Sequence, residues 1–267
     1  MSPRARRDAE VRLHGVNACL AAFAHRPDDL RKLWLTDANI PAFKPVLTWC
    51  VQQRIGYRVV AAEEIERLTA SSHHEGVCMA LRRRDPPTLV DVLAGLGKDE
   101  AALLLWLHGV GNPHNLGAIL RSAAHFGVRA ALVSDAAALS PAAYRVAEGG
   151  AEAVPCVPAA DVAHTCDRLH RAGFQLAATV VRGGDGLYEK PLPARLVLLL
   201  GAEQTGLPQA LTARADLRLR IPGTGAVESL NVSVAAALLI AEWGREQGAG
   251  SRKQGAGSRD QGAGSRE

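Results

Sequence analysis

Side chains that could act in chemistry gather in three short segments of the sequence. NPHNLGAILRSAAHFG holds Asn115 and Arg121, GAEQTGLP holds Glu203, and GAVESLNVS holds Ser229 and Asn231. Arg121 stands among apolar residues, and a partly buried guanidinium needs an anion, for which phosphate is a good geometric match. Structural roles are equally open at this point, because Asn115 and Ser229 are good helix N-caps, Glu203 could cap a tight turn and Arg121 could be a surface or interface charge.

The glycines of these segments do not complete a nucleotide-binding motif. Gly109 and Gly111, just before the first segment, begin a G-x-G pattern, but His114 stands where a dinucleotide fingerprint needs its third glycine. Gly201 and Gly206 bracket four residues as in a phosphate loop, but Leu207 follows where that loop needs lysine. A nicotinamide or nucleoside-triphosphate enzyme is therefore disfavoured. We also expect no metal site, because the histidines lack ligand spacing and no C-x-x-C occurs.

The three segments follow strands of one predicted α/β unit. Continuous apolar strands separated by helices favour a parallel sheet covered on both faces. Ligands of such sheets bind beyond the carboxyl ends of the strands, so the loops after Leu107, Val181, Leu200 and Ile221 are the places to expect a site. We expect strands at 103–107, 130–134, 174–181, 196–200 and 217–221, and helices at 116–126, 162–171 and 230–243.

A smaller α/β unit is predicted before this one, over residues 10–82. Short helical and strand-like pieces alternate there, which argues for an α/β layer. Residues 83–100, with Pro86-Pro87 and two glycines, are expected to link it to a catalytic unit at residues 101–244. The expected helices are 15–24, 45–54 and 63–69, and the expected strands are 33–36, 57–60 and 77–81.

The two ends of the chain are expected to lack a fixed structure. Residues 1–9 are predicted to be flexible. Residues 245–267 contain QGAGSRK, QGAGSRD and QGAGSRE, a repeat without a large apolar residue, so this tail has nothing to bury and should be disordered.

Charge and hydropathy restrict the partners and the compartment. Residues 1–85 hold 14 Lys and Arg against 10 Asp and Glu, whereas residues 86–244 hold 12 against 14, so the N-terminal part suits a polyanion such as RNA. No apolar run reaches the roughly 18 residues that span a bilayer. Five scattered cysteines argue against a disulfide framework. We therefore expect a cytoplasmic protein with no membrane partner.

Taken together and in order, NPHNLGAILRSAAHFG, LVLLLGAEQTGLP and IPGTGAVESLNVSVAAALLIAEW resemble the three motifs of the SpoU-type (TrmH) family of RNA ribose 2′-O-methyltransferases. The resemblance covers about residues 100–244. The preceding segment, from HGVNACLAAF to HHEGVCMALRRR, resembles the small substrate-binding domain that many members carry. The arrangement is most similar to the branch that methylates a guanosine of large-subunit rRNA.

The resemblance implies an α/β fold of the SPOUT type, in which the C-terminal part of the parallel sheet domain is tied in a trefoil knot behind a small N-terminal α/β substrate-binding domain. It implies a homodimer, an RNA substrate and S-adenosyl-L-methionine bound in the knot. By motif position it assigns the cofactor pocket to Gly201, Ile221 and Leu230, with Thr179 and Val180 as further lining residues. It assigns the catalytic site to Asn115, Arg121, Glu203, Ser229 and Asn231.

The resemblance also suggests roles in methyl transfer. A guanidinium is a poor base, so Arg121 is expected to bind the adjacent RNA phosphate and the developing alkoxide while another group or the phosphate takes the proton. Asn231 and Ser229 would hold the loop and the ribose, and Glu203 would orient Arg121 or loop donors. Two alternatives stay open: a tRNA substrate, or a non-catalytic RNA-binding protein of ribosome assembly.

Overall fold

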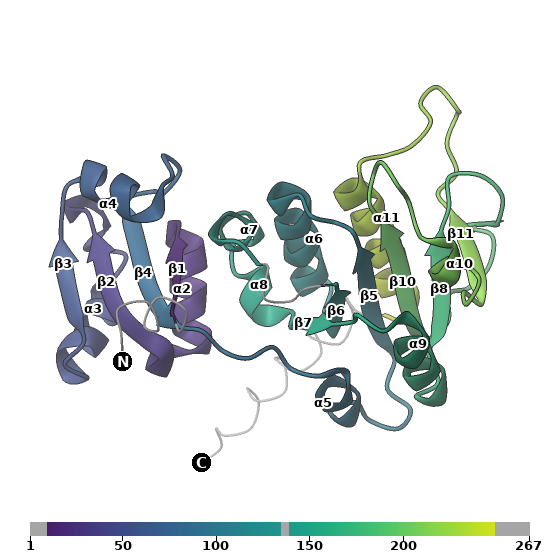
Figure 1. Cartoon of the computed structure of the whole chain (residues 1–267), viewed down its shortest axis with the longest axis horizontal. Coiled ribbons are helices and arrows are strands. Elements are labelled where there is room, and N and C mark those ends of the chain that lie inside the picture. Colours follow the sequence, from purple (N-terminus) through teal and green to yellow (C-terminus); the bar gives the residue numbers. More distant parts are fainter. Residues whose placement is uncertain (1–9, 135–138, 249–267) are drawn as a thin grey trace, which may run out of the picture.

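The protein builds two sheets of different size (Figure 1). A computed structural model describes residues 10–134 and 139–248, so the expectations for residues 1–9 and for most of the tail concern residues outside these ranges. The N-terminal sheet has the order β1-β4-β2-β3 and is antiparallel except for the pair β2 and β3. The C-terminal sheet has the order β7-β6-β5-β10-β8-β11-β9 with parallel pairing throughout. The predicted parallel sheet behind a small α/β unit is confirmed.

The N-terminal sheet carries helices on both faces. Its main core lies under α2 and α3 around Leu33 and Met79, and on the other face α4 packs its Ile65 against Trp34. The strand β1 was not predicted, because EVRLH is short and mostly polar, and it forms by pairing with β4. The elements are β1 (Glu10–His14), α2 (Val16–His25), β2 (Leu30–Leu35), α3 (Lys44–Gln52), β3 (Gly56–Val59), α4 (Ala62–Thr69) and β4 (Val77–Arg82).

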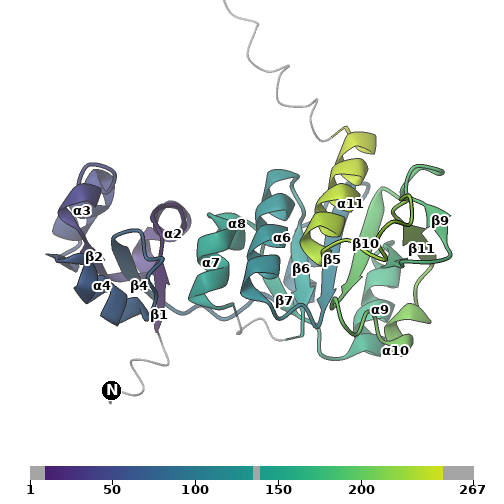
Figure 2. The ribbon, with the colours of Figure 1, turned by 90° about the horizontal axis from the view of Figure 1, so that it is seen from above.

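The C-terminal sheet lies between two helical layers, as Figure 2 shows. Helices α6 and α11 bury one face over Leu105 and Leu198, and α5, α9 and α10 bury the other over Trp106 and Val197. The strands are β5 (Ala102–His108), β6 (Ala130–Val133), β7 (Cys156–Pro158), β8 (Gln175–Thr179), β9 (Asp185–Gly186), β10 (Arg195–Gly201) and β11 (Leu217–Arg220). The helices are α5 (Leu89–Ala94), α6 (Pro113–His125), α7 (Pro141–Ala147), α8 (Gly150–Ala153), α9 (Val162–Arg171), α10 (Gln209–Thr212) and α11 (Val232–Glu246).

The structure also departs from the sequence prediction in the expected linker and at the start of the expected tail. The stretch 83–100 contains α5, which begins after a capping box between Thr88 and Asp91 and buries Leu89 against the α9 face of the sheet. Helix α11 continues to Glu246, two residues into the segment expected to be tail, and the Glu246 carboxylate accepts a 2.6 Å hydrogen bond from the backbone N–H of Leu192. In the described ranges no helix is both long and apolar enough to cross a membrane.

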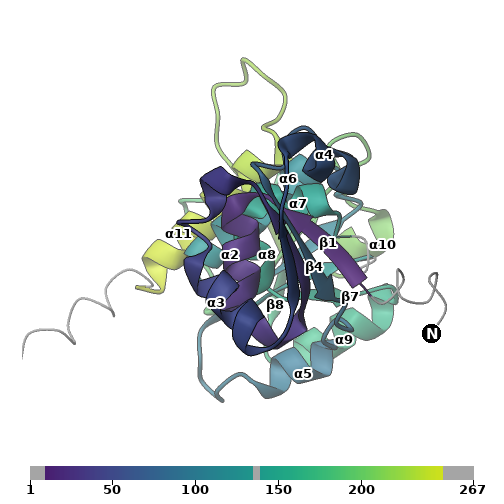
Figure 3. The same ribbon diagram turned by 90° about the vertical axis from the view of Figure 1, so that its left-hand side faces the viewer.

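Helices α7 and α8 lie between the two parts of the molecule, with α6 on one side and α2 on the other (Figures 1 and 2). Figure 3 looks along this row, with α2 in front of α7 and α8. Glycines allow the close approach. A Cβ on Gly117 of α6 would lie 2.6 Å from Cβ of Val146, and one on Gly150 would lie 2.5 Å from the carbonyl oxygen of Leu120. On the other side, a Cβ on Gly149 would lie 2.8 Å from Cβ of Ala21 in α2. The α7–α8 segment is therefore held against both neighbours.

A buried ion pair holds the same junction, and its loss should destabilise the protein. Arg26 Nη2 lies 2.6 Å from Glu152 Oε1, and the two side chains are only 6% and 9% exposed. The Glu152→Ala variant leaves a buried guanidinium without its counter-charge, so we expect its free energy of unfolding to fall by about 3–5 kcal/mol. Urea denaturation measures this change.

The matched control is Asp167→Ala, which removes the partner of Arg214 from an exposed pair of 2.8 Å. Exposed pairs contribute at most about 1 kcal/mol. Equal losses in the two variants would show that the Arg26–Glu152 pair does not stabilise the junction.

Candidate active site

Three loops at the carboxyl ends of parallel strands enclose a cavity of about 450 Å³. They follow β8, β10 and β11, and the last is the long loop that rises at the upper right of Figure 1 between β11 and α11. Of the four loops that the sequence singled out, the one after Leu107 does not line the cavity. The five residues expected to line a cofactor pocket all border it: Thr179, Val180, Gly201, Ile221 and Leu230.

The loop after β10 folds back on itself at its base. Ala202 and Gly206 form an isolated antiparallel bridge, and the Gly206 N–H donates a 2.8 Å hydrogen bond to the carbonyl oxygen of Ala202. A Cβ on Gly201 would lie only 2.3 Å from the carbonyl carbon of Gly206. This wall of the cavity is therefore built of backbone, and its shape requires glycine at position 201.

Polar side chains from all three sequence segments meet beside the cavity. Glu203 Oε1 accepts hydrogen bonds from Asn231 Nδ2 at 2.6 Å and Asn115 Nδ2 at 3.2 Å. The backbone N–H of Val232 donates to the same oxygen at 3.3 Å. Asn231 Nδ2 also lies 3.0 Å from Asn115 Oδ1. The cluster ties the loop after β10 to the first turns of α6 and α11.

The helix caps decide which of these side chains are free for the cluster. Asn112, not Asn115, is the N-cap of α6 and accepts the His114 N–H at 2.9 Å. Asn231, not Ser229, is the N-cap of α11, through its Oδ1, while its Nδ2 reaches Glu203. The capping alternatives for Asn115 and Ser229 are therefore wrong. Ser229 is exposed and lines the cavity.

Arg121 lies apart from the cluster. Its side chain is 59% exposed, because α6 turns Ile119, Leu120 and Ala123 into the core and Arg121 away from it, so the expected partial burial is wrong. Arg121 Nη1 pairs with Glu148 Oε1 at 2.8 Å. Glu203 was expected to orient either Arg121 or donors of the loops. In the structure it accepts hydrogen bonds from Asn231 and Val232 and does not contact Arg121.

Glu148 is a residue that the sequence analysis missed. It follows α7, a short alanine-rich helix without a strong apolar period, and it adopts a left-handed conformation with φ of +45°. The two glycines that follow Glu148 could have drawn attention to it, because a glycine pair often ends a helix. A side chain at such an end can turn toward a neighbouring helix.

The cysteine side chains of the described residues are not placed as catalytic nucleophiles. All five cysteines are buried, and burial raises the pKa of Cys78 to about 11 and that of Cys156 to about 12, which keeps these thiols protonated near neutral pH. The adjacent histidine and glutamate His74 and Glu75 bind backbone groups: His74 Nδ1 accepts the Gly76 N–H, and Glu75 Oε2 accepts the Val16 N–H. Within residues 10–134 and 139–248, no group of three His, Cys, Asp or Glu side chains is arranged to hold a metal.

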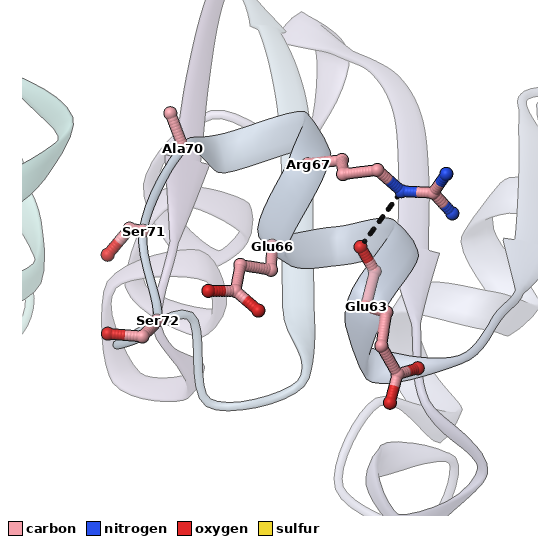
Figure 4. Close-up of a pocket in the computed structure, with 6 residues that line it drawn as sticks. All are labelled: Glu63, Glu66, Arg67, Ala70, Ser71 and Ser72. Carbon is pink, nitrogen blue, oxygen red and sulfur yellow. Dashed lines mark hydrogen bonds between the residues drawn. The ribbon is translucent and has the colours of Figure 1, made fainter.

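A second hollow lies at the end of α4 and is shown in Figure 4. It is an open surface feature, and in it the Nε of Arg67 donates to the backbone carbonyl of Glu63 at 3.2 Å. Among the residues that line it, no polar cluster is comparable to the one at Glu203. The cavity at the sheet is therefore the candidate active site.

Comparison with known families agrees with this geometry. Residues 102–241 match the model of the SpoU rRNA methylase family, and residues 12–87 match that of RNA 2′-O-ribose methyltransferase substrate binding. The chain belongs to the SpoU family. The first match contains the cavity and the polar cluster, and the second covers the N-terminal sheet.

The sequences of two relatives align with most of this SpoU family member. A protein of Escherichia coli O157:H7, named uncharacterized tRNA/rRNA methyltransferase YfiF, is 40% identical over 92% of this chain and 71% of its own length. The 23S rRNA (guanosine-2′-O-)-methyltransferase RlmB of Nitrosomonas europaea is 33% identical over 88% of this chain and 91% of its own.

Solved structures share the fold. A crystal structure of an RNA 2′-O-ribose methyltransferase superposes with a TM-score of 0.75 at 25% identity, over 92% of each chain. The SpoU methyltransferase AviRb of Streptomyces viridochromogenes, solved in complex with S-adenosylmethionine, gives a TM-score of 0.74 at 22% identity, over 92% of this chain and 94% of its own. The second likeness shows the fold alone.

Proposed function

We propose that this SpoU family protein methylates the ribose 2′-hydroxyl of a guanosine in large-subunit rRNA, with S-adenosyl-L-methionine as methyl donor. The observation that carries the proposal is the meeting of Asn115, Glu203 and Asn231 beside a cavity at the carboxyl ends of the sheet. The 33% identical RlmB relative supports rRNA as the substrate class.

The cavity suits the methyl donor in size and lining. Its volume of about 450 Å³ lies within the roughly 300–1,000 Å³ of small-molecule sites. Apolar side chains such as Leu219 and Ile221 line it together with the backbone of Gly201. Thr179 Oγ1 donates to the carbonyl oxygen of Leu199 at 2.8 Å. Thr179 therefore lines the cavity, but its hydroxyl hydrogen is already used in this bond. When bound there, the cofactor supplies a methyl group on a sulfonium.

The chain's own residues must orient the ribose and stabilise the developing charge. A C–O bond forms as the C–S bond breaks, and the hydroxyl proton passes to a phosphate oxygen or another acceptor. The network of Glu203, Asn231 and Asn115 fixes the loops that would surround the ribose. Ser229 places a further hydroxyl at the cavity. Such orientation lowers the entropic part of the barrier.

Arg121 is proposed to bind the neighbouring RNA phosphate and the alkoxide as it forms. It lies six residues after Asn115, so the two are about 9 Å apart along the axis of α6. An RNA strand that crosses α6 from the cavity would therefore bring its backbone toward Arg121. More than half of this side chain is exposed, which leaves most of its donors available.

Further parts of the proposal follow from the fold family. We propose residues 10–82 as the RNA-binding domain, 83–100 as its linker and 101–244 as the catalytic domain, which the two family matches support. We propose a trefoil knot in the C-terminal segment and a homodimer, which the exposed Val234 and Leu238, one turn apart on α11, support. Sedimentation equilibrium measures the oligomeric state. RNA as substrate also supports a cytoplasmic location.

The proposed activity is tested with labelled S-adenosylmethionine and three unmodified RNAs offered separately: large-subunit rRNA, small-subunit rRNA and tRNA. We expect label at one ribose of large-subunit rRNA, mapped as an alkali-resistant position. Label on tRNA would support methyltransferase activity but show that the substrate is tRNA and not rRNA. Cofactor binding by calorimetry with no label on any RNA, including an assembly particle, would favour the non-catalytic RNA-binding protein.

A further inference from the structure

We infer that Glu148 is a positioning residue for Arg121 and that it couples the arginine to the docked N-terminal part of the chain. The inference rests on the proposed role of Arg121 in methyl transfer. The carboxylate of Glu148 bridges two helices: Oε1 pairs with Arg121 Nη1 of α6 at 2.8 Å, and Oε2 accepts a 3.4 Å hydrogen bond from Asn17 Nδ2 of α2.

The backbone at Glu148 favours glycine over a residue with a long side chain. Glu148 is the C-cap of α7 with φ of +45° and ψ of 44°, in the left-handed region where helices commonly end with glycine. Glycine would relieve this conformation but would lack the carboxylate. The side chain that occupies the position instead contacts both Arg121 and Asn17.

The surroundings fix Glu148 relative to both partners. A Cβ on Gly150 would lie 2.8 Å from Cα of Arg121, and one on Gly149 would lie 2.8 Å from Cβ of Ala21. The chain on the C-terminal side of Glu148 is therefore packed closely against α6 and α2. The Glu148 carboxylate therefore holds the Arg121 guanidinium at a defined position on the side of α6 that faces α2.

The ion pair should affect turnover and RNA affinity in opposite directions. Arg121 has five N–H donors, and the bond through Nη1 leaves others for an RNA phosphate. Fixing the guanidinium favours the transition state, so losing Glu148 should lower kcat. The Glu148 charge also repels phosphate, so losing it should leave KM for RNA unchanged or reduce it. A residue that only supported the fold would not produce this split.

The decisive variant is Glu148→Gly, because it removes the carboxylate while suiting the backbone. We expect kcat for methyl transfer to fall on the order of tenfold, KM for RNA not to rise, and the midpoint of urea unfolding to stay equal or increase. The matched control for the backbone effect is Ala70→Gly, at the C-cap of α4 with φ of +51°, beside the second hollow (Figure 4). It should share the stability effect, and because it lies in the proposed RNA-binding domain it is compared for stability alone.

Two further variants distinguish a positioning role from a purely structural one. Glu148→Gln keeps an acceptor oxygen for Arg121 and should restore most of the lost kcat. In single-turnover assays on an Arg121→Ala background, where the ion pair is already absent, Glu148→Gly should have no further effect.

Failure of the inference is distinguishable from failure of the proposed function. Wild-type kcat in Glu148→Gly, together with loss of activity in Arg121→Ala, would overturn the positioning role and leave the proposed function intact. An equal fall in the methyl-transfer rate on the Arg121→Ala background would also overturn it. Normal turnover in Arg121→Ala would instead remove the role of Arg121 on which the inference rests.

Discussion

Replacing Arg121 by alanine should reduce the rate of methyl transfer to RNA by about two to three orders of magnitude without weakening S-adenosylmethionine binding. The residue lies on α6 outside the cavity lining, so the cofactor pocket should be unaffected. Arg121→Lys should also be impaired, because an ammonium keeps the charge but loses the fork that matches phosphate. Single-turnover methyl transfer and calorimetry measure the two quantities.

Arg129→Ala is the matched control for Arg121. Arg129 is also an exposed arginine in an ion pair, with Glu100 at 3.3 Å, and it lies outside the cavity lining. Its loss should change turnover by less than about threefold, because exposed ion pairs of this kind contribute little. If Arg121→Ala and Arg121→Lys both kept near-normal turnover, the proposed role of Arg121 in catalysis would be wrong.

The second large effect is expected at Gly201, where alanine should weaken S-adenosylmethionine binding by between about 10- and 100-fold. The added methyl would meet backbone, namely the carbonyl group of Gly206 at 2.3–2.4 Å and the nitrogen of Leu207 at 2.6 Å. Backbone cannot move aside as a flexible side chain can, so the loop that forms this wall must shift. Calorimetric titration of the cofactor measures the loss.

Gly223→Ala provides the comparison within the same cavity. Gly223 also lines the cavity, but a Cβ there would meet nothing within 4 Å. Its cofactor affinity should stay within about twofold of wild type, since no packed atom has to move. Circular dichroism on both variants checks that the fold is retained. Equal affinities in Gly201→Ala and the wild type would show that the tight turn does not shape the cofactor site.

Most strands of the parallel sheet and its three longest helices, α6, α9 and α11, follow from the order of the amino acids alone. Runs such as LLLWL and LVLLL are apolar on both sides of the strand, which only a sheet covered on both faces can bury. The same pattern indicated which loops to search, because strand ends in such a sheet share one edge. The pairing of Gly201 with His108 places the ends of β10 and β5 side by side and brings their loops together.

Short elements without their own periodicity were decided by tertiary contacts. The strand β1 forms on β4, α5 packs Leu89 against the sheet, and α7 and α8 are held by the close contacts of Gly117 and Gly150. In each of them too few residues are present for an apolar pattern to appear. Their stability comes from surfaces that lie elsewhere in the sequence.

The candidate site divides in the same way. The motif residues Asn115, Glu203 and Asn231 were found from sequence, although Glu203 lies 88 residues from Asn115 and 28 from Asn231 along the chain. Which asparagine caps a helix and which reaches Glu203 depended on helix starts that differ by a few residues from the predicted ones. The pairing of Arg121 with Glu148 was decided only by the packing of α7–α8 between α6 and α2, because no local pattern specifies a contact between two helices.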